Sequence, residues 1–239
     1  MREKLEDRTN NIILKSVNLS TCFSSYYTRI LTEMVSNIVI FGSTGQTGIC
    51  AVEAAVKKGL EVRAFVRDPA RLPLHLHDKV DIYQGNVLEP DSVNEAVEGM
   101  DAVVICLGTG NNLEATSDMS EGTKNILDSM RGKNVKIVSA CMSCFLLYEP
   151  DKVPPRFNAV NDDHKRMYQA LKESPLNYIA VFPPHIADEP SREKIIEINP
   201  TQSPGRSISK WDLGAFMVDC LSEPKYYRSV IGIANVPKA

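Results

Sequence analysis

Three glycines at three-residue intervals form the motif GSTGQTG at residues 42–48. The motif lies between an apolar segment, residues 37–41, and an amphipathic one, residues 51–59. A glycine loop between a strand and a helix lets the backbone approach a pyrophosphate, and the N–H groups at the helix start favour its negative charge. The flanking patterns therefore predict a dinucleotide-binding loop, against the alternative of a tight turn without a ligand. Its residues are Gly42, Ser43, Thr44, Gly45, Gln46, Thr47 and Gly48.

Two arginines follow the second apolar segment. Dinucleotide-binding folds carry a carboxylate for the ribose 2′-hydroxyl about twenty residues after the loop. This chain has FVRDPARL there, so Arg67 replaces the acid and Arg71 follows shortly after. Guanidinium groups match a 2′-phosphate in charge and in fork geometry. We therefore expect NADPH rather than NADH as the cofactor, unless both arginines only solvate a surface loop.

Cysteine and histidine pairs elsewhere do not complete a metal site. Cys141 and Cys144 form a C-x-x-C at the end of a strand pattern rather than at a helix start, and the sequence holds no second such pair. His75 and His77 form an H-x-H without an evident third ligand. We therefore predict neither a bound metal nor a redox disulfide.

The elements that must position these residues alternate along the chain from residue 37 onward. Short β-branched segments and helical patterns follow one another, which is typical of parallel strands joined by crossover helices. Strands are expected over 37–41, 61–66, 80–84, 102–107, 135–140 and 177–182, and helices over 46–58, 91–98, 118–132 and 157–173. The pattern predicts an α/β fold: a single Rossmann-like, doubly wound parallel sheet with helices on both faces.

The helix ends and the last part of the chain carry weaker signals. Gly59, Gly99 and Gly132 stand where helix ends favour a left-handed residue. Beyond residue 182 we expect a rigid loop, FPPHIADEP, and a short strand over 194–198. A final helix should begin at Ser209 as its N-cap, with Asp212 as the capping-box partner.

Composition excludes several classes of protein. A formal net charge of -3 and a pI near 5.9 argue against a nucleic-acid partner. The chain has no run of roughly 18 apolar residues, so we predict no membrane span. Six cysteines in 239 residues are too few for a disulfide scaffold, which favours a reducing, cytoplasmic location. Residues 1–33 are predicted to be a disordered or loosely docked extension, and Met34 could be the functional start of one domain over 34–239.

A set of longer motifs runs in order over residues 35–222: FGSTGQTG, VRDPARLP, GNVL, LGTGN, MSEGTKNI, SCFLLYEPDKVPPR, DDHKRM, FPPHIADEP and SISKWDLGAFM. Together they resemble the flavin reductase (NADPH), or biliverdin-IXβ reductase, family of atypical short-chain dehydrogenases. The resemblance implies a monomeric cytosolic enzyme that passes hydride from NADPH to flavins (FMN, FAD, riboflavin) and to linear tetrapyrroles such as biliverdin-IXβ.

The resemblance also assigns residues beyond the glycine loop and the two arginines, and the topology of the fold favours some of the same positions. Asn86 and Val87 would meet the adenine. The nicotinamide side would comprise Leu107, Gly108, Met119, Cys141, Ser143, His164, His185 and Ile186, and the substrate floor would include Phe145 and Arg156. Ser143 and His185 would be catalytic: Ser143 holds the nicotinamide or substrate edge, and His185 brackets the cofactor and relays a proton. Without the resemblance, His185 reads as a loop residue and His164 as part of a solvated helix face.

Four positions depart from the family pattern and concern the preference for an acceptor. They are Asn86, Gly110, Met142 and Tyr148, where the family usually has Asp, Arg, Thr and Trp. Ordinary short-chain dehydrogenases also use a Tyr-x-x-x-Lys pair on one helix. Tyr148 and Lys152 match it by letters, but Pro150 interrupts the segment, so we predict that they do not form that pair.

Two other functions remain open from the sequence. One is a redox sensor of the same fold that binds NADP(H) without turnover, which would not need an open acceptor site. The other is a sugar-nucleotide epimerase, which would normally retain the helical Tyr-Lys pair.

Overall fold

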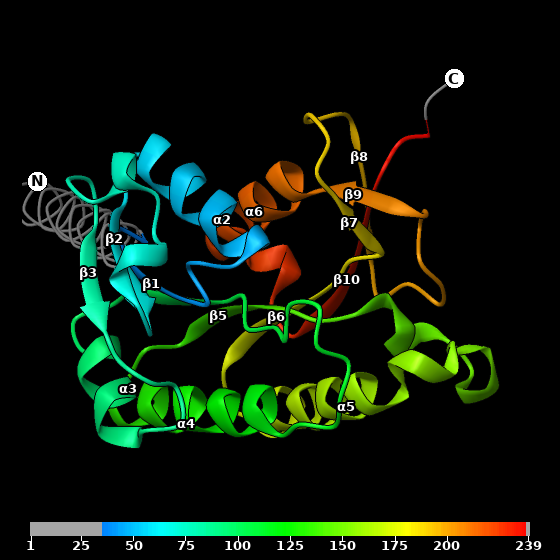
Figure 1. The fold of residues 1–239 in the computed structure, drawn as a ribbon, viewed down its shortest axis with the longest axis horizontal. Coiled ribbons are helices and arrows are strands. Elements are labelled where there is room, and N and C mark those ends of the chain that lie inside the picture. The colour runs from blue at the N-terminus through cyan, green and yellow to red at the C-terminus, as the bar shows by residue number, and fades with distance from the viewer. Residues whose placement is uncertain (1–34, 238–239) are drawn as a thin grey trace, which may run out of the picture. The chain divides into compact units, whose positions relative to one another are not determined.

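The computed structural model describes residues 35–237. The predicted extension, residues 1–33, and the proposed start at Met34 lie outside the described residues. Within the described part, eight strands form one sheet in the order β3-β2-β1-β4-β5-β6-β10-β8 (Figure 1). The strands are β1 (Asn37–Phe41), β2 (Glu61–Val66), β3 (Asp81–Gln84), β4 (Ala102–Ile105), β5 (Ile137–Cys141), β6 (Asn177–Phe182), β8 (Lys194–Ile198) and β10 (Ser229–Asn235).

Strand β1 lies at the point where the strand order changes direction. It pairs in parallel with β2 on one side and with β4 on the other. Alternate residues of β1 serve opposite faces of the sheet: Ile38 and Ile40 pack in one hydrophobic cluster, and Val39 and Phe41 in the other. The strand is buried on both faces, as expected for a parallel sheet covered by helices.

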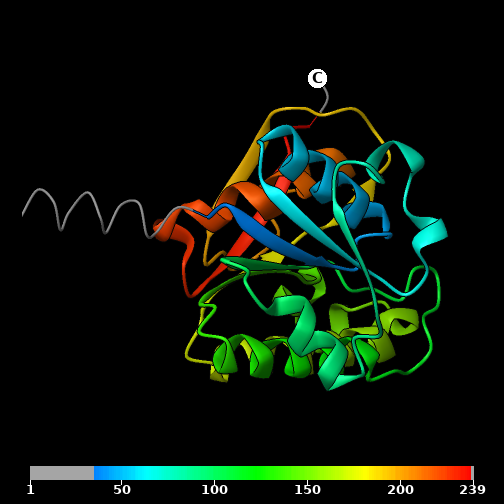
Figure 2. The same ribbon diagram turned by 90° about the vertical axis from the view of Figure 1, so that its left-hand side faces the viewer.

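Helices cover both faces of the sheet (Figure 2). One face carries α2 (Gln46–Lys57) and α6 (Lys210–Asp219), and the other carries α3 (Pro90–Val97), α4 (Asp118–Gly132) and α5 (Asn158–Glu173). Helices α2 and α6 approach at backbone distance, because a Cβ on Gly214 would lie 2.6 Å from Cβ of Cys50 and 2.7 Å from the backbone nitrogen of Ala51. The described residues contain no helix that is both long and apolar enough to span a bilayer.

The predicted fold class is confirmed, with differences at its C-terminal end. Strand β8 pairs antiparallel with β10, so the sheet is mostly rather than wholly parallel. Strand β10 was not predicted, nor was a separate parallel pair made of β7 (His185–Ala187) and β9 (Ser207–Ser209). The predicted rigid loop after residue 182 is therefore partly wrong. Three-residue strands carry too little periodicity to be read from sequence.

Two predictions about helix ends are wrong, and others are confirmed. Gly59 and Gly99 adopt positive φ values of 77° and 79°, as predicted. Gly132 instead remains the last residue of α4, and the left-handed residue is Asn134 at φ 59°. The side chain of Ser209 caps α6 by accepting from the N–H of Trp211, as predicted.

Asp212 is not the capping-box partner of Ser209. Its carboxylate accepts from the backbone N–H of Arg192 at 2.8 Å and from the amide of Asn235 at 2.8 Å. These partners come from segments far along the chain. A capping box is a local pattern, and here tertiary hydrogen bonds to a buried carboxylate replaced it.

Candidate functional site

The glycine loop packs its backbone directly against the end of β4 and against itself. A Cβ on Gly42, whose φ is +78°, would lie 2.3 Å from the carbonyl oxygen of Cys106, and a Cβ on Gly48 would lie 2.0 Å from the carbonyl oxygen of Gly42. Real side chains do not tolerate such contacts. The loop therefore requires glycine at both positions, independently of any ligand.

The N-terminus of α2 has the properties of an anion site. Its N-cap is Gly45, which offers no side-chain cap, and its first turn holds no acidic residue. The first N–H groups of a helix lack intrahelical acceptors. The hydroxyl of Ser43 donates to the carbonyl of Phe65 at 2.9 Å and so ties the loop to β2. An uncapped twelve-residue helix behind a glycine loop fits a pyrophosphate.

The two predicted 2′-phosphate residues stand at the C-terminal end of β2. Arg67 lines an open hollow of about 320 Å³ together with Gln84, Asn86 and Glu89. The amide of Gln84 donates to the carbonyl of Arg67 at 3.2 Å. Arg71 is exposed in the short 3-10 helix η1 (Pro69–Arg71) that follows. The arginines are thus available to a phosphate at this edge, although Glu89 would oppose it.

Helix α4 approaches the predicted adenine edge closely. A Cβ on Gly122 would lie 2.8 Å from the side chain of Val87 and 3.3 Å from that of Leu107. The amide of Asn125 donates to the carbonyl of Val87 at 3.0 Å. The side chain of Asn86 accepts from the N–H of Leu88, which shapes the turn after β3. Gly108 follows β4 and is exposed.

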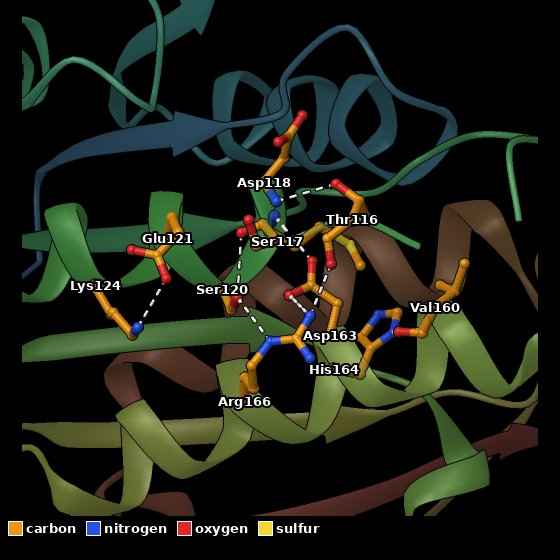
Figure 3. A network of polar contacts seen from close by, with 11 residues as sticks. Thr116, Ser117, Asp118, Ser120, Glu121, Lys124, Val160, Asp163, His164 and Arg166 are labelled. Carbon is orange, nitrogen blue, oxygen red and sulfur yellow. Dashed lines mark hydrogen bonds and ion pairs between the residues drawn. The ribbon is translucent and has the colours of Figure 1, made fainter. Parts of the chain in front are cut away.

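A buried carboxylate joins the start of α4 to α5 (Figure 3). Asp163 is fully buried, and its Oδ2 accepts from the backbone N–H of Met119 at 3.1 Å. Its Oδ1 accepts from Arg166 at 2.9 Å. The same Arg166 nitrogen donates to the carbonyl of Thr116 at 2.7 Å. This network fixes the loop before α4 and the position of Met119, a predicted nicotinamide contact.

His164 lies beside this network on α5. Its Nδ1 is 3.1 Å from the carbonyl oxygen of Val160, which can only accept, so Nδ1 carries the proton. Burial lowers the pKa of His164, since desolvation penalises the charged imidazolium. The residue is partly buried and packed rather than part of a fully solvated face.

The predicted acceptor side begins where β5 ends. Ser143 caps the short 3-10 helix η3 (Cys144–Leu147), and its Oγ accepts from the N–H of Phe145 at 3.2 Å. Cys141 is buried, and burial raises the pKa of its thiol to about 12. Burial also raises the pKa of Cys144. Protonated, desolvated thiols are poor nucleophiles and poor metal ligands.

Aromatic rings surround Phe145. Its ring lies 5.4 Å from that of Tyr148, edge to face, and 5.0 Å from that of Phe157. The guanidinium of Arg156 lies 4.8 Å from the centre of the Phe157 ring. These contacts make an amphipathic surface suited to a flat ligand.

Tyr148 and Lys152 do not share a helix. Helix η3 ends at Leu147, Tyr148 is extended, and Lys152 belongs to the separate 3-10 helix η4 (Pro150–Lys152). Lys152 lies 3.6 Å from Asp151 instead. The prediction that these two residues do not form a helical Tyr-Lys pair is confirmed.

His185 and Ile186 lie in β7, directly after β6. His185 pairs with Ser207 of β9 and is exposed. Because parallel strands end at the same edge of a sheet, the residues after β1, β2, β4, β5 and β6 share one edge. The structure therefore brings the predicted loop, arginine, nicotinamide and floor residues to one edge, without testing the role of any of them. No cluster of three or more potential metal ligands occurs among residues 35–237.

Comparisons with known proteins bear on the family of the chain and on its cofactor. Residues 42–224 match the model of a family described as NAD(P)H-binding. An oxidoreductase of Pestalotiopsis microspora is 22% identical over 228 residues, which cover 84% of this chain and 86% of the relative. The family match confirms a nicotinamide cofactor and supports NADPH. The resemblance to flavin reductases in particular stays a prediction.

Solved structures show how widely the fold is shared. A putative NAD-dependent epimerase/dehydratase of Bacillus halodurans has a TM-score of 0.75 at 20% identity, covering 85% of this chain and 95% of that one. An anaerobilin reductase of Escherichia coli O157:H7 has a TM-score of 0.71 at 14% identity, covering 85% of this chain and 100% of that one. At these identities the likeness establishes the Rossmann-like fold alone.

Proposed function

This chain belongs to the NAD(P)H-binding family, and from that premise we propose that it is an NADPH-dependent reductase of flavins (FMN, FAD, riboflavin) and linear tetrapyrroles such as biliverdin-IXβ. The proposal rests on the residues that make up the acceptor side. It offers a hydroxyl, Ser143, beside an aromatic floor at Phe145, and it lacks the helical Tyr-Lys pair that carbonyl chemistry uses. Conjugated acceptors require a hydride and a flat binding surface. They depend less on a side chain of the protein as proton donor.

The bound NADPH supplies a hydride to this side. The chain contributes orientation, because a donor and an acceptor held in contact react far faster than free molecules. Oγ of Ser143 accepts from the N–H of Phe145, so its own O–H proton can be donated to the nicotinamide amide or to the acceptor edge. His185, exposed on β7, would bracket the cofactor and relay a proton from water.

The setting proposed for this reaction is a monomer in the cytoplasm. Five cysteines of the described residues are free, and four of them are buried. Free thiols in a chain of this size favour a reducing compartment.

The proposal is tested by the oxidation of NADPH with riboflavin or biliverdin-IXβ as acceptor. We expect turnover, with kcat about tenfold lower for Ser143→Ala, because one donor to the reacting groups is lost. Lys152→Ala is the control and should leave kcat/KM within about twofold, since Lys152 is exposed and pairs only weakly with the exposed Asp151. Tight NADPH binding without turnover of any acceptor would contradict the proposal and favour a sensor.

A further inference from the structure

The open hollow at the C-terminal end of β2 is lined by a cation and an anion. Its volume is about 320 Å³, and Arg67 and Glu89 both line it. Within residues 35–237 neither side chain has an ion-pair partner, so the two charges share the hollow without neutralising each other. A carboxylate repels a phosphate. Phosphate binding by Arg67 therefore does not explain why Glu89 is there.

The backbone around Glu89 holds the carboxylate at the rim of the hollow. Glu89 is the N-cap residue of α3, and its side chain makes no cap hydrogen bond. Its N–H donates to the carbonyl of Asn86 at 2.9 Å, and Pro90 follows it as the first residue of the helix. Proline fixes its own φ and restricts the residue before it. The turn is therefore rigid, while the carboxylate stays available to a partner outside the helix.

The amide side chains of the hollow are already engaged. Oδ1 of Asn86 accepts from the N–H of Leu88 at 3.1 Å, and Nε2 of Gln84 donates to the carbonyl of Arg67 at 3.2 Å. A carboxylate forms stronger hydrogen bonds than an amide oxygen, because its charge assists them. A ligand that brings an N–H group into the hollow thus meets its best acceptor at Glu89.

We infer that the carboxylate of Glu89 accepts a hydrogen bond from the 6-amino group of the cofactor's adenine, and so selects adenine over other purines. The adenosine end of NADPH carries a phosphate and an amino group, which match the cation and the anion of the hollow. Strands β2 and β3 pair in parallel, so the residues that follow them can meet one nucleotide. This inference rests on the NADPH cofactor of the proposed function and is independent of the acceptor.

The test compares NADPH with its deamino analogue, in which hypoxanthine replaces adenine and a carbonyl oxygen replaces the 6-amino group. Dissociation constants are measured by calorimetry, without an acceptor. We expect the wild-type protein to bind NADPH about tenfold more tightly, because a carbonyl oxygen facing Glu89 finds no donor. Glu89→Gln supplies an amide that can donate to that oxygen, so the preference should fall to within about twofold. Glu61→Gln, exposed at the other end of β2, is the matched control and should keep the tenfold preference.

A second pair of nucleotides separates the base from the phosphate. NADH and deamino-NADH should show the same preference, because Glu89 contacts the base. If Glu89 only repels the phosphate, Glu89→Gln strengthens NADPH binding and leaves the base preference unchanged. That result would overturn the inference, as would equal binding of NADPH and its deamino analogue to the wild-type protein. Failure of the proposed function looks different: the base preference is present, but neither flavin nor biliverdin-IXβ is reduced.

Discussion

The cofactor side and the proposed acceptor side of the sheet edge are built in different ways. The cofactor side is backbone: glycines in contact with carbonyl groups, and a helix start without a cap. The proposed acceptor side consists of side chains on and around short 3-10 helices, where the Tyr148 ring meets Phe145 edge to face and the Phe157 ring is tilted against it. A backbone site tolerates no substitution at its contacts but binds any molecule with the right phosphates. A side-chain site can change its ligand one residue at a time.

The largest effect should come from breaking the backbone site. Gly48→Ala places a Cβ 2.0 Å from the carbonyl oxygen of Gly42, so the loop cannot keep its form. We expect NADPH affinity to fall by more than about 100-fold, as measured by calorimetry. Gly132→Ala meets no atom within 4 Å and serves as the control. Normal binding by Gly48→Ala would contradict the backbone description.

Next in size is the link between α4 and α5. Asp163→Ala leaves Arg166 and the N–H of Met119 without their buried acceptor. We expect the free energy of unfolding to fall by about 1–3 kcal/mol, as measured by urea denaturation, because the N–H of Met119 loses its acceptor while the half-exposed Arg166 can still reach water. Asp162→Ala, whose ion pair with Lys165 is exposed, should cost less than about 1 kcal/mol. Equal losses in the two variants would show that the buried network stabilises the protein no more than the exposed ion pair does.

The contribution of the two arginines on the cofactor side to NADPH binding can be tested by replacing them. Replacing both Arg67 and Arg71 with alanine should weaken NADPH binding by about 30- to 100-fold and NADH binding by less than about threefold, since only NADPH carries the 2′-phosphate. The ratio of the two dissociation constants is the measurement. A similar loss for both cofactors would mean that the arginines act on the shape of the loop rather than on the phosphate.

The smallest effect concerns pH and His164. Burial lowers the pKa of His164 in the folded protein, so the unfolded chain binds a proton more readily. The stability contribution is complete above the usual histidine value of 6.5 and is lost as the pH falls below it. His164→Gln should therefore flatten the fall in the free energy of unfolding below that pH. If the free energy of unfolding of His164→Gln falls with decreasing pH as steeply as that of the wild type, other groups are responsible for the acid sensitivity.

The two sides also differ in how far the sequence predicts them. The glycine loop and α4 follow from local patterns, and α4 begins and ends at the predicted residues, 118 and 132. The link through Asp163 and Arg166 was missed, because a carboxylate in a charged stretch, DDHKRM, gives no local sign that it is buried. Its one sequence signal is the spacing of three residues between acid and arginine.

The difference between local sequence patterns and tertiary contacts also explains the errors near the C-terminus. Asp212 has the spacing of a capping box, yet its partners Arg192 and Asn235 lie some 20 residues away on either side. Strand β10 was missed, although its centre is apolar, because it lies at the end of the chain without a following helix pattern. The roles of the predicted site residues stay predictions, since only ligand binding can test them.

The close contact at Gly214 has a consequence for the order in which the protein becomes functional during synthesis. Helix α2, which carries the glycine loop, has its outer neighbour in α6, more than 150 residues later in the chain. A ribosome has therefore to release most of the chain before α2 is held from both sides. Cofactor affinity should be acquired late in translation, once the segment around Gly214 has emerged. A nascent chain that ends before this segment should be stabilised little by NADPH.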